Sequence, residues 1–439
     1  MTTTNVKCLL LLSSKLGYQF RGFAEAARGL GADVVIGSDR CKSLDDPWRD
    51  GAVPLKFEKP EAASERLLEE MADRPVEGIL ALGDRPIEAA ALTARALGIP
   101  YNSPEAVANC RSKLRQREVL RDAGLPVPEF VSFRLKENLA KVLPRVKFPC
   151  VVKPHRLFAS TGVIRTNNEE EFAAAVHRVA ELLASPEIKV MREPEMDCLL
   201  VEHYLPGGEV AVEGLLTAGQ LRVLAVFDKP DPLEGPYFEE TIYVTPSRLP
   251  ALALASLRAL LDKAVRSLGL THGPLHAEFR INEDGPWVIE IAPRPIGGLC
   301  SRALRFGPQK IYLEELLVRH ALGLEGSDLP REPLASGVMM IPVPQSGILE
   351  SVEGVEEARR VPCVEEIQIT ARLHDYIAAW PDGSSYLGFI FARAALPEEA
   401  EAALREAHAK LRFTFKPRLP VEHPLSHKVP TTDRGRTKP

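Results

Sequence analysis

The first hundred residues alternate between short apolar runs and segments with helical spacing. Apolar runs occur at 6–12, 34–36 and 78–84. The apolar positions between the first two runs recur at helical spacing and are Phe20, Phe23, Ala24, Ala27 and Leu30. This alternation is the βαβ rhythm of a parallel sheet, and it predicts a Rossmann-like domain over residues 1–105.

The predicted first domain lacks the usual means of holding a nucleotide. No Gly-x-Gly-x-x-Gly follows its first strand, and no loop ending in Gly-Lys-Ser or Gly-Lys-Thr occurs in the chain. The glycines of such loops let backbone amides approach phosphate oxygens. Any nucleotide must therefore bind in a later part of the chain.

Helix boundary signals mark the passage into a second domain. Ser103 followed by Pro104 predicts a helix start. Gly124 followed by Pro126 predicts the end of the next helix. We therefore expect a second domain over residues 106–334.

Strand composition resumes near residue 335, and an alanine- and glutamate-rich helix follows at 397–411. This pattern predicts a small α+β lobe over residues 335–420. Residues 421–439 are rich in proline, threonine and basic residues without periodicity, so we expect a disordered tail. The whole chain is therefore predicted to be a multidomain protein of mixed α/β and α+β class.

The densest polar pattern lies in residues 274–298, where two strand-like halves flank the turn-forming run Asn-Glu-Asp-Gly-Pro. Side chains alternate between the two faces of a strand. The predicted apolar face consists of Leu275, Ala277, Phe279, Ile281, Trp287, Ile289 and Ile291. The predicted polar face consists of His276, Glu278, Arg280, Glu290, Ala292 and Arg294.

Two carboxylates of this polar face are expected to lie opposite each other. If Ile281 pairs with Trp287 across a five-residue loop, Glu278 falls opposite Glu290. Directly opposed like charges destabilise a strand pair unless a cation lies between them. Carboxylate ligands favour magnesium, which takes its other ligands from water and phosphates. The hairpin thus predicts a magnesium site, and the alternatives are solvated glutamates or neutralisation by neighbouring arginines.

Two further strands end in residues suited to a nucleotide. One strand ends in Lys153, which must either reach solvent or meet an anion, and the following loop contains Ser160, Thr161 and Gly162. Hydroxyls and backbone amides of such a loop can hold phosphoryl oxygens, although an ordinary surface turn is the alternative. The other strand, 199–205, contains one acidic residue and precedes another.

These acidic residues are Glu202 within the strand and Glu209 just after it. Extended backbone at this point can meet the edge of a purine, and a nearby carboxylate can accept from ribose hydroxyls. The alternative is a pair of solvated acids flanking a strand.

Composition favours a globular protein that acts on small molecules. The chain has 439 residues, of which 45% are hydrophobic, and a formal net charge of −5. This balance excludes non-specific binding to nucleic acids or membrane surfaces. Seven scattered cysteines without a Cys-x-x-Cys pair indicate reduced thiols, and the longest early apolar run is too short for a signal peptide. We expect a cytoplasmic protein and leave a homodimer open.

An ordered set of residues resembles the ATP-grasp superfamily over residues 105–330, and it consists of Lys113, Lys153, Glu202, Glu209, Glu278, Glu290 and Arg294. The resemblance implies that ATP is bound by Lys113, Lys153, Ser160, Thr161, Gly162, Glu202, Leu205 and Glu209. It also implies that Glu278 and Glu290 bind two magnesium ions, which manganese can replace. Arg294 is implied to be the catalytic residue that stabilises negative charge at the acyl phosphate.

Within this superfamily, the sequence from Glu290 to Gly298 looks most like the L-amino acid ligase group. That resemblance implies an ATP-dependent carboxylate–amine ligase that joins amino acids through an acyl phosphate and releases ADP and phosphate. Substrate contacts are expected from His276, Gly297 and Gly298, with the loop 228–240 as an alternative. One departure is Ala292, where many members carry a metal-binding asparagine.

The sequence is compatible with three other functions. A carboxylase-like relative of the same superfamily, similar to biotin carboxylase, would activate bicarbonate instead of an amino acid. A non-catalytic ATP-binding module is a second alternative, which Ala292 keeps in view. A dehydrogenase is a third, but the missing glycine fingerprint argues against it.

Overall fold

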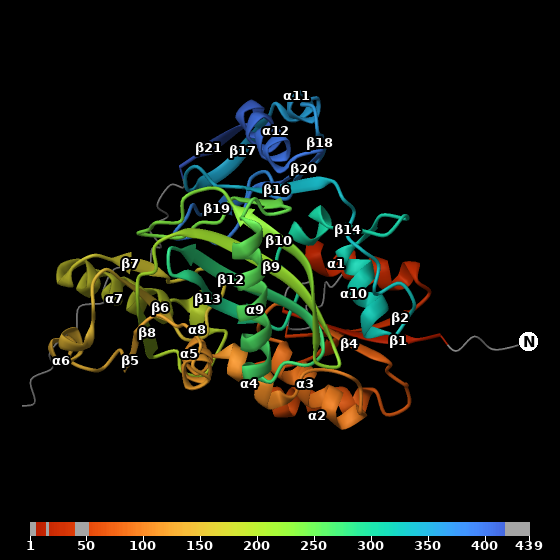
Figure 1. Ribbon diagram of the computed structural model, residues 1–439, viewed down its shortest axis with the longest axis horizontal. Helices are drawn as coiled ribbons and strands as arrows, with labels where there is room; N and C mark the ends of the chain where they lie inside the picture. The colour runs from red at the N-terminus through yellow and green to blue at the C-terminus, as the bar shows by residue number, and fades with distance from the viewer. Residues whose placement is uncertain (1–5, 15–16, 40–51, 418–439) are drawn as a thin grey trace, which may run out of the picture.

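The computed structural model describes residues 6–14, 17–39 and 52–417. Figure 1 shows an N-terminal domain in red and orange, a yellow domain at the opposite side, a central green sheet between them and a blue region above it. Parallel and antiparallel sheets occur together with helices, so the predicted mixed multidomain class is confirmed. The predicted disordered tail, 421–439, lies outside the described residues.

The N-terminal domain is built on a four-stranded parallel sheet with the order β3-β2-β1-β4. Its strands are β1 (Cys8–Ser13), β2 (Asp33–Ser38), β3 (Val53–Pro54) and β4 (Gly78–Leu82). Every residue of β1 is buried, which explains its continuous apolar sequence. Helix α1 (Tyr18–Gly29) packs on one face, and α2 (Pro60–Glu70) and α3 (Ile87–Leu97) pack on the other.

An eight-stranded antiparallel sheet forms the centre of the molecule, with the order β13-β12-β9-β10-β11-β16-β20-β18. Its strands are β9 (Gly208–Thr217), β10 (Gln220–Lys229), β11 (Ile242–Thr245), β12 (Gly273–Asn282), β13 (Gly285–Ala292), β16 (Ala335–Ile341), β18 (Val364–Ile369) and β20 (Gly388–Ala394). The last three strands come from the predicted C-terminal lobe. The backbone ladder therefore continues across the expected boundary at residue 335.

One face of this sheet packs against α9 (Ala251–Leu268), α4 (Pro104–Arg111) and α5 (Lys113–Asp122). Apolar side chains of β9, β10, β12 and β13 meet the leucines of α9 in this layer. The predicted helix start is confirmed, because the Ser103 hydroxyl accepts a hydrogen bond from the Ala106 amide at 3.1 Å and Pro104 begins the helix.

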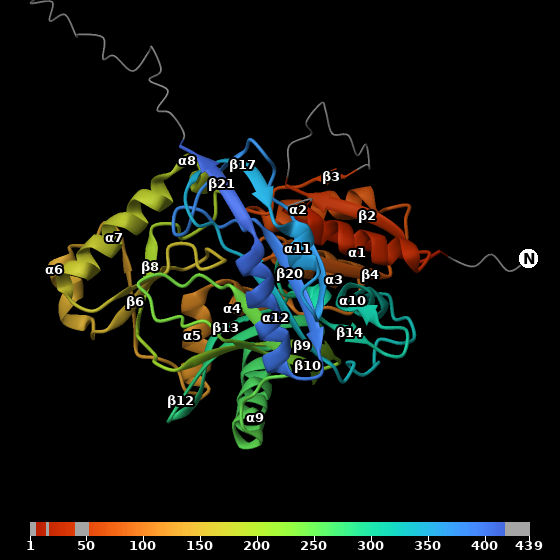
Figure 2. The same ribbon diagram turned by 90° about the horizontal axis from the view of Figure 1, so that it is seen from above.

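A separate four-stranded antiparallel sheet, which we call the lid sheet, has the order β5-β8-β6-β7. Its strands are β5 (Phe130–Arg134), β6 (Cys150–Pro154), β7 (Ile164–Thr166) and β8 (Cys198–His203). The helical segments of this domain are α6 (Leu139–Val142), η1 (Leu143–Arg145), α7 (Glu169–Ala184) and α8 (Pro186–Lys189). Helix α7 packs on one face of the sheet, as Figures 1 and 2 show.

The remaining elements connect or cap the central sheet. They are η2 (Cys300–Ala303), β14 (Arg305–Phe306), β15 (Ile311–Tyr312), α10 (Leu313–Ala321), β17 (Gly347–Glu353), α11 (Val355–Arg359), β19 (Tyr376–Ile377), α12 (Pro397–Lys410) and β21 (Arg412–Lys416). Helix α12 packs against β16 and β20, and the small sheet β19-β17-β21 lies beyond them. Among the described residues, no helix is long and apolar enough to cross a membrane.

The β12–β13 hairpin shows both a confirmed prediction and an error. Glu278 pairs with Glu290, as predicted. The turn is shorter than expected, since Ile281 pairs with Pro286, and a bulge after Glu278 restores the glutamate register. The bulge also changes the apolar face of the second strand: Val288 enters the core, and Ile289 lines a cavity instead.

Helix α10 fixes the N-terminal domain to the rest of the molecule by packing against α1 and β4. Gly78, at the start of β4, lies directly against the end of α10. A Cβ atom at this position would stand 2.4 Å from the Ala321 carbonyl oxygen, which is backbone and cannot rotate away. A glycine at this position therefore permits the close approach of the two segments.

We expect Gly78→Ala to lower the free energy of unfolding by about 1–3 kcal/mol, because the added methyl group forces the two backbones apart. The matched control is Gly29→Ala in α1, where no atom lies within 4 Å of the added Cβ. That control should be neutral or stabilising by up to about 1 kcal/mol. Urea denaturation followed by circular dichroism measures both variants, and equal stabilities would contradict the close packing.

Candidate active site

A cavity of about 770 Å³ lies where the N-terminal domain, the lid sheet and the central sheet meet. This volume is in the range of small-molecule binding sites. Its walls come from the loops after β1 and β4, from the β6–β7 loop, from β12 and β13, and from the segment between β18 and β20. The site is therefore assembled from parts of the chain that are far apart in sequence.

Strand β12 crosses the cavity and orders its chemistry. His276, Glu278 and Arg280 all line the cavity, while Ala277 and Phe279 enter the core on the other face. Alternate residues of a strand are about 6.6 Å apart, so the three polar side chains span about 13 Å. Arg280 lies at one end of this row and His276 at the other.

At the first end, Arg280 is buried against the segment that follows β8. Its Nη1 donates to the Leu205 carbonyl and to the Tyr204 hydroxyl, both at 3.0 Å. Its Nη2 donates to the Leu233 carbonyl, and its Nε donates to Glu209 at 3.2 Å. These bonds fix the extended backbone around residue 205, where the sequence predicts a purine contact.

A buried ion-pair cluster lies behind this segment. Glu202 accepts from Arg117 Nε at 2.7 Å and from Lys153 Nζ at 2.5 Å, and all three side chains are buried. Burial alone would raise the pKa of Glu202, but Arg117 and Lys153 outweigh it and lower the pKa to about 2. The Glu202 carboxylate is thus already paired with two cations, and its backbone lies within the ladder between β5 and β6.

Lys153 keeps a cavity-lining position within this cluster. Burial disfavours its charged form and lowers its pKa to about 8, against the opposing attraction of Glu202. Lys113 also reaches the cavity, where its Nζ donates to Glu290 at 2.7 Å and to the Leu157 carbonyl at 3.1 Å. The two predicted phosphate-binding lysines therefore line the same cavity.

The predicted phosphate loop only partly faces the cavity. Ser160 lines it, whereas Thr161 and Gly162 do not belong to the lining. Ser160 has a φ of 49° and Gly162 a φ of 74°, both in the left-handed region. For a serine this backbone is strained, which is common in loops that contact ligands.

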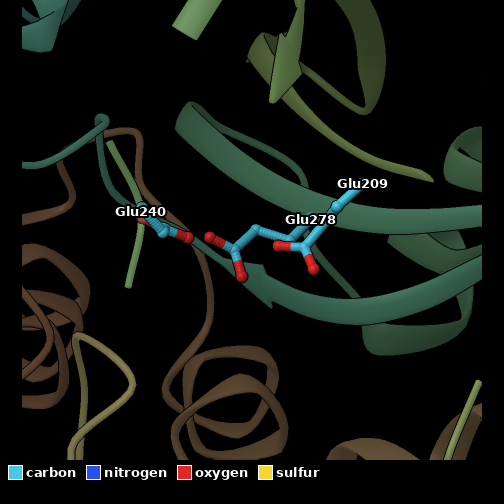
Figure 3. Close-up of side chains that lie close together, drawn as sticks. All are labelled: Glu209, Glu240 and Glu278. Carbon is cyan, nitrogen blue, oxygen red and sulfur yellow. The ribbon is translucent and has the colours of Figure 1, made fainter. Parts of the chain in front are cut away.

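Three carboxylates gather at the middle of β12. Single oxygens of Glu209, Glu240 and Glu278 lie within 4.8 Å of one another, and Figure 3 shows these side chains directed toward one another. The Lys229 ammonium lies among them, at 2.7 Å from Glu209, 2.5 Å from Glu240 and 3.1 Å from Glu278. Burial would lower the pKa of Lys229, but these carboxylates raise it well above its usual value.

The donor chemistry of the hairpin fits a magnesium ion. Glu278 and Glu290 stand opposite each other in the ladder and supply hard carboxylate oxygens on the cavity side. Each carboxylate already contacts an ammonium, Glu290 that of Lys113 and Glu278 that of Lys229. Lys229 supplies one positive charge to three carboxylates, and Glu278 belongs both to this triad and to the predicted metal-binding pair with Glu290.

At the far end of β12, His276 joins two glutamates. Its Nδ1 lies 2.5 Å from Glu213, which also accepts from the Ile296 amide at 3.2 Å. Its Nε2 lies 3.4 Å from Glu278. Burial disfavours the imidazolium, but Glu213 and Glu278 outweigh burial and raise the pKa of His276 to about 9. These two carboxylates favour the charged imidazolium, which argues against a general-base role for His276.

Arg294 reaches the cavity from the loop after β13. Its Nε donates to Asp84 at 2.9 Å, and Asp84 follows β4 in the N-terminal domain. Burial disfavours both charged forms, yet each partner stabilises the other, so the pKa of Asp84 is lowered and that of Arg294 is raised. Gly297 and Gly298 line the cavity beside this pair.

Three charged residues of the site are missing from the sequence predictions: Arg117, Glu213 and Asp84. Arg117 lies one helical turn after Lys113, so the helix face was readable in principle. Asp84 follows a buried parallel strand, and ligands of open α/β sheets bind at that end of the strands. The partners of both residues lie far away in sequence.

Family comparisons agree with this geometry. Residues 24–101 match an ATP-grasp N-terminal domain, residues 146–303 an ATP-grasp domain, and residues 339–416 the L-amino acid ligase C-terminal domain 2. The chain therefore contains an ATP-grasp domain, with matching domains on both sides of it. Because its C-terminal region matches a domain described for L-amino acid ligases, the predicted resemblance to that group is confirmed as well.

A solved structure gives the same result over almost the whole chain. The L-amino acid ligase from Bacillus licheniformis is 28% identical, with a TM-score of 0.77, and the match covers 94% of this chain and 100% of that one. A phosphoribosylglycinamide synthetase from Anaerococcus prevotii has a TM-score of 0.67 at 16% identity over 94% and 100% of the two chains, which shows the fold alone.

Several curated relatives are named as ligases or synthases, and two of them illustrate the similarity to this chain. Alanine–anticapsin ligase of Bacillus amyloliquefaciens is 26% identical, and the match covers 60% of this chain and 59% of the relative. Carnosine synthase 1 of Gallus gallus is 28% identical, over 68% of this chain and 35% of the relative. The chain spans 35% to 65% of the length of three curated relatives that it matches, one of which is the carnosine synthase.

The charge state of His276 is testable. We expect Glu213→Gln to lower the pKa of His276 from about 9 by at least about one unit, because the variant removes the carboxylate that stabilises the imidazolium. Titration of the histidine signals by NMR measures this pKa, and His276→Gln identifies the signal.

The matched control is Glu315→Gln on α10, where the carboxylate pairs with Arg319. It should leave the His276 titration in place. A His276 pKa that is the same in Glu213→Gln as in the unaltered protein would contradict the assigned pairing.

Proposed function

We propose that this protein is an ATP-dependent carboxylate–amine ligase that joins amino acids and releases ADP and phosphate. The observation that carries the proposal is the polar face of β12 and β13, where Glu278 and Glu290 stand opposite each other between Lys113 and Arg294. This arrangement suits the transfer of a phosphoryl group to a carboxylate.

The first part of the reaction needs positive charge around the phosphates of ATP. Lys113 and Lys153 line the cavity and would bind phosphoryl oxygens, and the extended backbone at residue 205 would meet the purine. Glu278 and Glu290 would hold magnesium, which neutralises charge on the transferring phosphoryl group when it is bound. Arg294, oriented by Asp84, would stabilise negative charge on the acyl group.

The proposed chemistry has two steps. A carboxylate oxygen of the first substrate attacks the γ-phosphorus of ATP, the bond from that phosphorus to the bridging oxygen breaks, and ADP leaves. The amine of the second substrate, after losing a proton, attacks the acyl carbon, and the carbon–oxygen bond to phosphate breaks. The protein contributes orientation and fixed charge to both steps.

Two alternative functions would give different results in an assay of ADP release. A bicarbonate-activating enzyme would release ADP with bicarbonate in place of amino acids. A non-catalytic ATP-binding protein would bind ATP without releasing ADP. Ala292, which pairs with His276 in the ladder and cannot bind a metal, is the residue that keeps the second alternative in view.

The expected outcome for the purified protein with magnesium and ATP is ADP release that depends on added amino acids. Pools of amino acids, of other amines and carboxylates, and bicarbonate are compared, and mass spectrometry identifies the product. Glu290→Gln should lower this rate at least about 100-fold while the fold is retained, because it removes a metal-binding charge.

Glu283→Gln, in the exposed turn of the same hairpin, is the matched control and should keep its activity. Full activity in Glu290→Gln would contradict the metal assignment. ADP release with bicarbonate alone, or none with any pool, would contradict the ligase proposal.

The low pKa of Lys153 predicts how ATP binding depends on pH. The ammonium form, which attracts phosphate, dominates below pH 8 and is lost as the pH rises through about 8. Calorimetric titration with ATP should therefore show falling affinity between pH 7 and pH 9.5. In Lys153→Met, affinity at pH 7 should be at least about tenfold weaker, and the inflection should disappear.

Lys147→Met is the matched control. Lys147 is an exposed lysine in the domain that contains the lid sheet, and it pairs with Glu129. It should keep both the affinity and the inflection. An inflection that persists in Lys153→Met would assign the pH dependence to another group.

A further inference from the structure

One part of the cavity has apolar and aromatic walls. We call it the aromatic chamber, and its wall residues are Tyr18, Cys300, Met340, Tyr386 and Phe389. They come from the start of α1, from η2, from β16, and from β20 and the loop before it. The N-terminal domain and the C-terminal strands thus close the same end of the site.

Contacts between these residues show that they form one surface. The rings of Tyr18 and Phe389 meet edge to face, with centroids 5.4 Å apart. Met340 pairs with Phe389 in the ladder between β16 and β20. The loop that carries Gly298 lies against the same wall, since a Cβ there would stand 3.2 Å from the Phe389 ring and 3.8 Å from the Cys300 sulfur.

The chamber walls carry no charge at neutral pH. Burial raises the pKa of Tyr18 to about 12. Burial also raises the pKa of Cys300 and Tyr386, and the nearby Glu240 carboxylate adds to both shifts. An apolar wall of this kind favours an apolar ligand group, because burying a charge or an unpaired polar group there is costly.

The entrance to the chamber is strongly polar by contrast. Glu240 accepts a hydrogen bond from the Tyr243 hydroxyl at 2.6 Å and contacts Lys229, and the Ile296 amide is held by Glu213. Arg294, Gly297 and Gly298 line the cavity next to it. The cavity therefore presents carboxylates, a guanidinium and an apolar wall to one bound molecule.

We propose that the aromatic chamber receives the side chain of the carboxylate-donating substrate and selects amino acids with large apolar or aromatic side chains. This proposal rests on the proposed ligase function. The substrate carboxylate would lie toward Arg294 and the backbone of Gly297 and Gly298, and its ammonium toward Glu240. Small, acidic and basic side chains would leave the chamber unfilled or would bury a charge in it.

The size of the expected selectivity follows from the chamber walls. In an apolar pocket, one methylene group changes kcat/KM by about 10- to 200-fold. Leucine, methionine or phenylalanine should therefore exceed alanine by at least about tenfold, and glutamate and lysine by more. The large residue should occupy the N-terminal position of the product, since it supplies the carboxylate.

The test measures ADP release for each of these amino acids as the carboxylate donor, with one common set of amine acceptors, and identifies the products by mass spectrometry. In Tyr18→Ala, KM for the large apolar donors should rise about tenfold or more, because one wall is lost. Tyr18→Phe keeps the ring and should keep the preference order. Leu252→Ala, an exposed apolar residue on α9, is the matched control and should match the unaltered protein.

The chamber assignment would be wrong, while the ligase function stands, if alanine, glutamate or lysine were used as well as the large apolar donors or better. It would also be wrong if large residues occurred only at the C-terminal position of the product, or if Tyr18→Ala kept the donor preference of the unaltered protein. Absence of ADP release with every amino acid, despite ATP binding, would instead overturn the ligase function. The two failures are therefore distinguishable, and the ATP affinity of each variant reports whether its nucleotide site is intact.

Discussion

The pairing of buried charges is the constraint on which the rest of this structure depends. A charged side chain removed from water is costly unless an opposite charge and further hydrogen bonds accompany it. The cavity contains many such side chains, and they are arranged in alternating sign: Arg117 and Lys153 around Glu202, then Lys229 among three carboxylates, then His276 with Glu213. Removing one member of these sets leaves a buried partner with fewer opposite charges around it.

The same pairs hold separate parts of the chain in register. Arg117 on α5 reaches β8 of the lid sheet, and Asp84 of the N-terminal domain reaches the loop after β13. Arg85, next to Asp84, contacts the domain that contains the lid sheet. Its Nε donates to Glu193 at 2.8 Å, and its Nη2 donates to the Met191 carbonyl at 2.9 Å. Three domains therefore meet at the cavity through charged contacts. The N-terminal domain also shares an apolar cluster with α10 and the central sheet, whereas the core of the lid-sheet domain is separate.

Local patterns predicted the parts of the site that depend on local geometry. The alternation of a strand is set by its own backbone, so the shared face of His276, Glu278 and Arg280 was readable from sequence. The bulge in β13 was not, because no residue there marks it, and the faces of Trp287 and Ile289 were misassigned. Long-range partners were also missed: Arg294 and Asp84 are 210 residues apart, and only the topology joins them.

The unbroken central sheet has a consequence for how such a protein can diversify. Glu290 on β13 and Phe389 on β20 belong to one hydrogen-bonded ladder, so their separation is fixed by strand spacing and not by loops. The segments that complete the chamber, such as the one before β20, are connections outside that ladder. Insertions or exchanges in these connections can reshape the end wall while the reacting groups stay in place. The part of the proposed chamber wall that lies outside the sheet, Tyr18, Cys300 and Tyr386, can thus change independently of the reacting groups, whereas Met340 and Phe389 belong to the sheet itself.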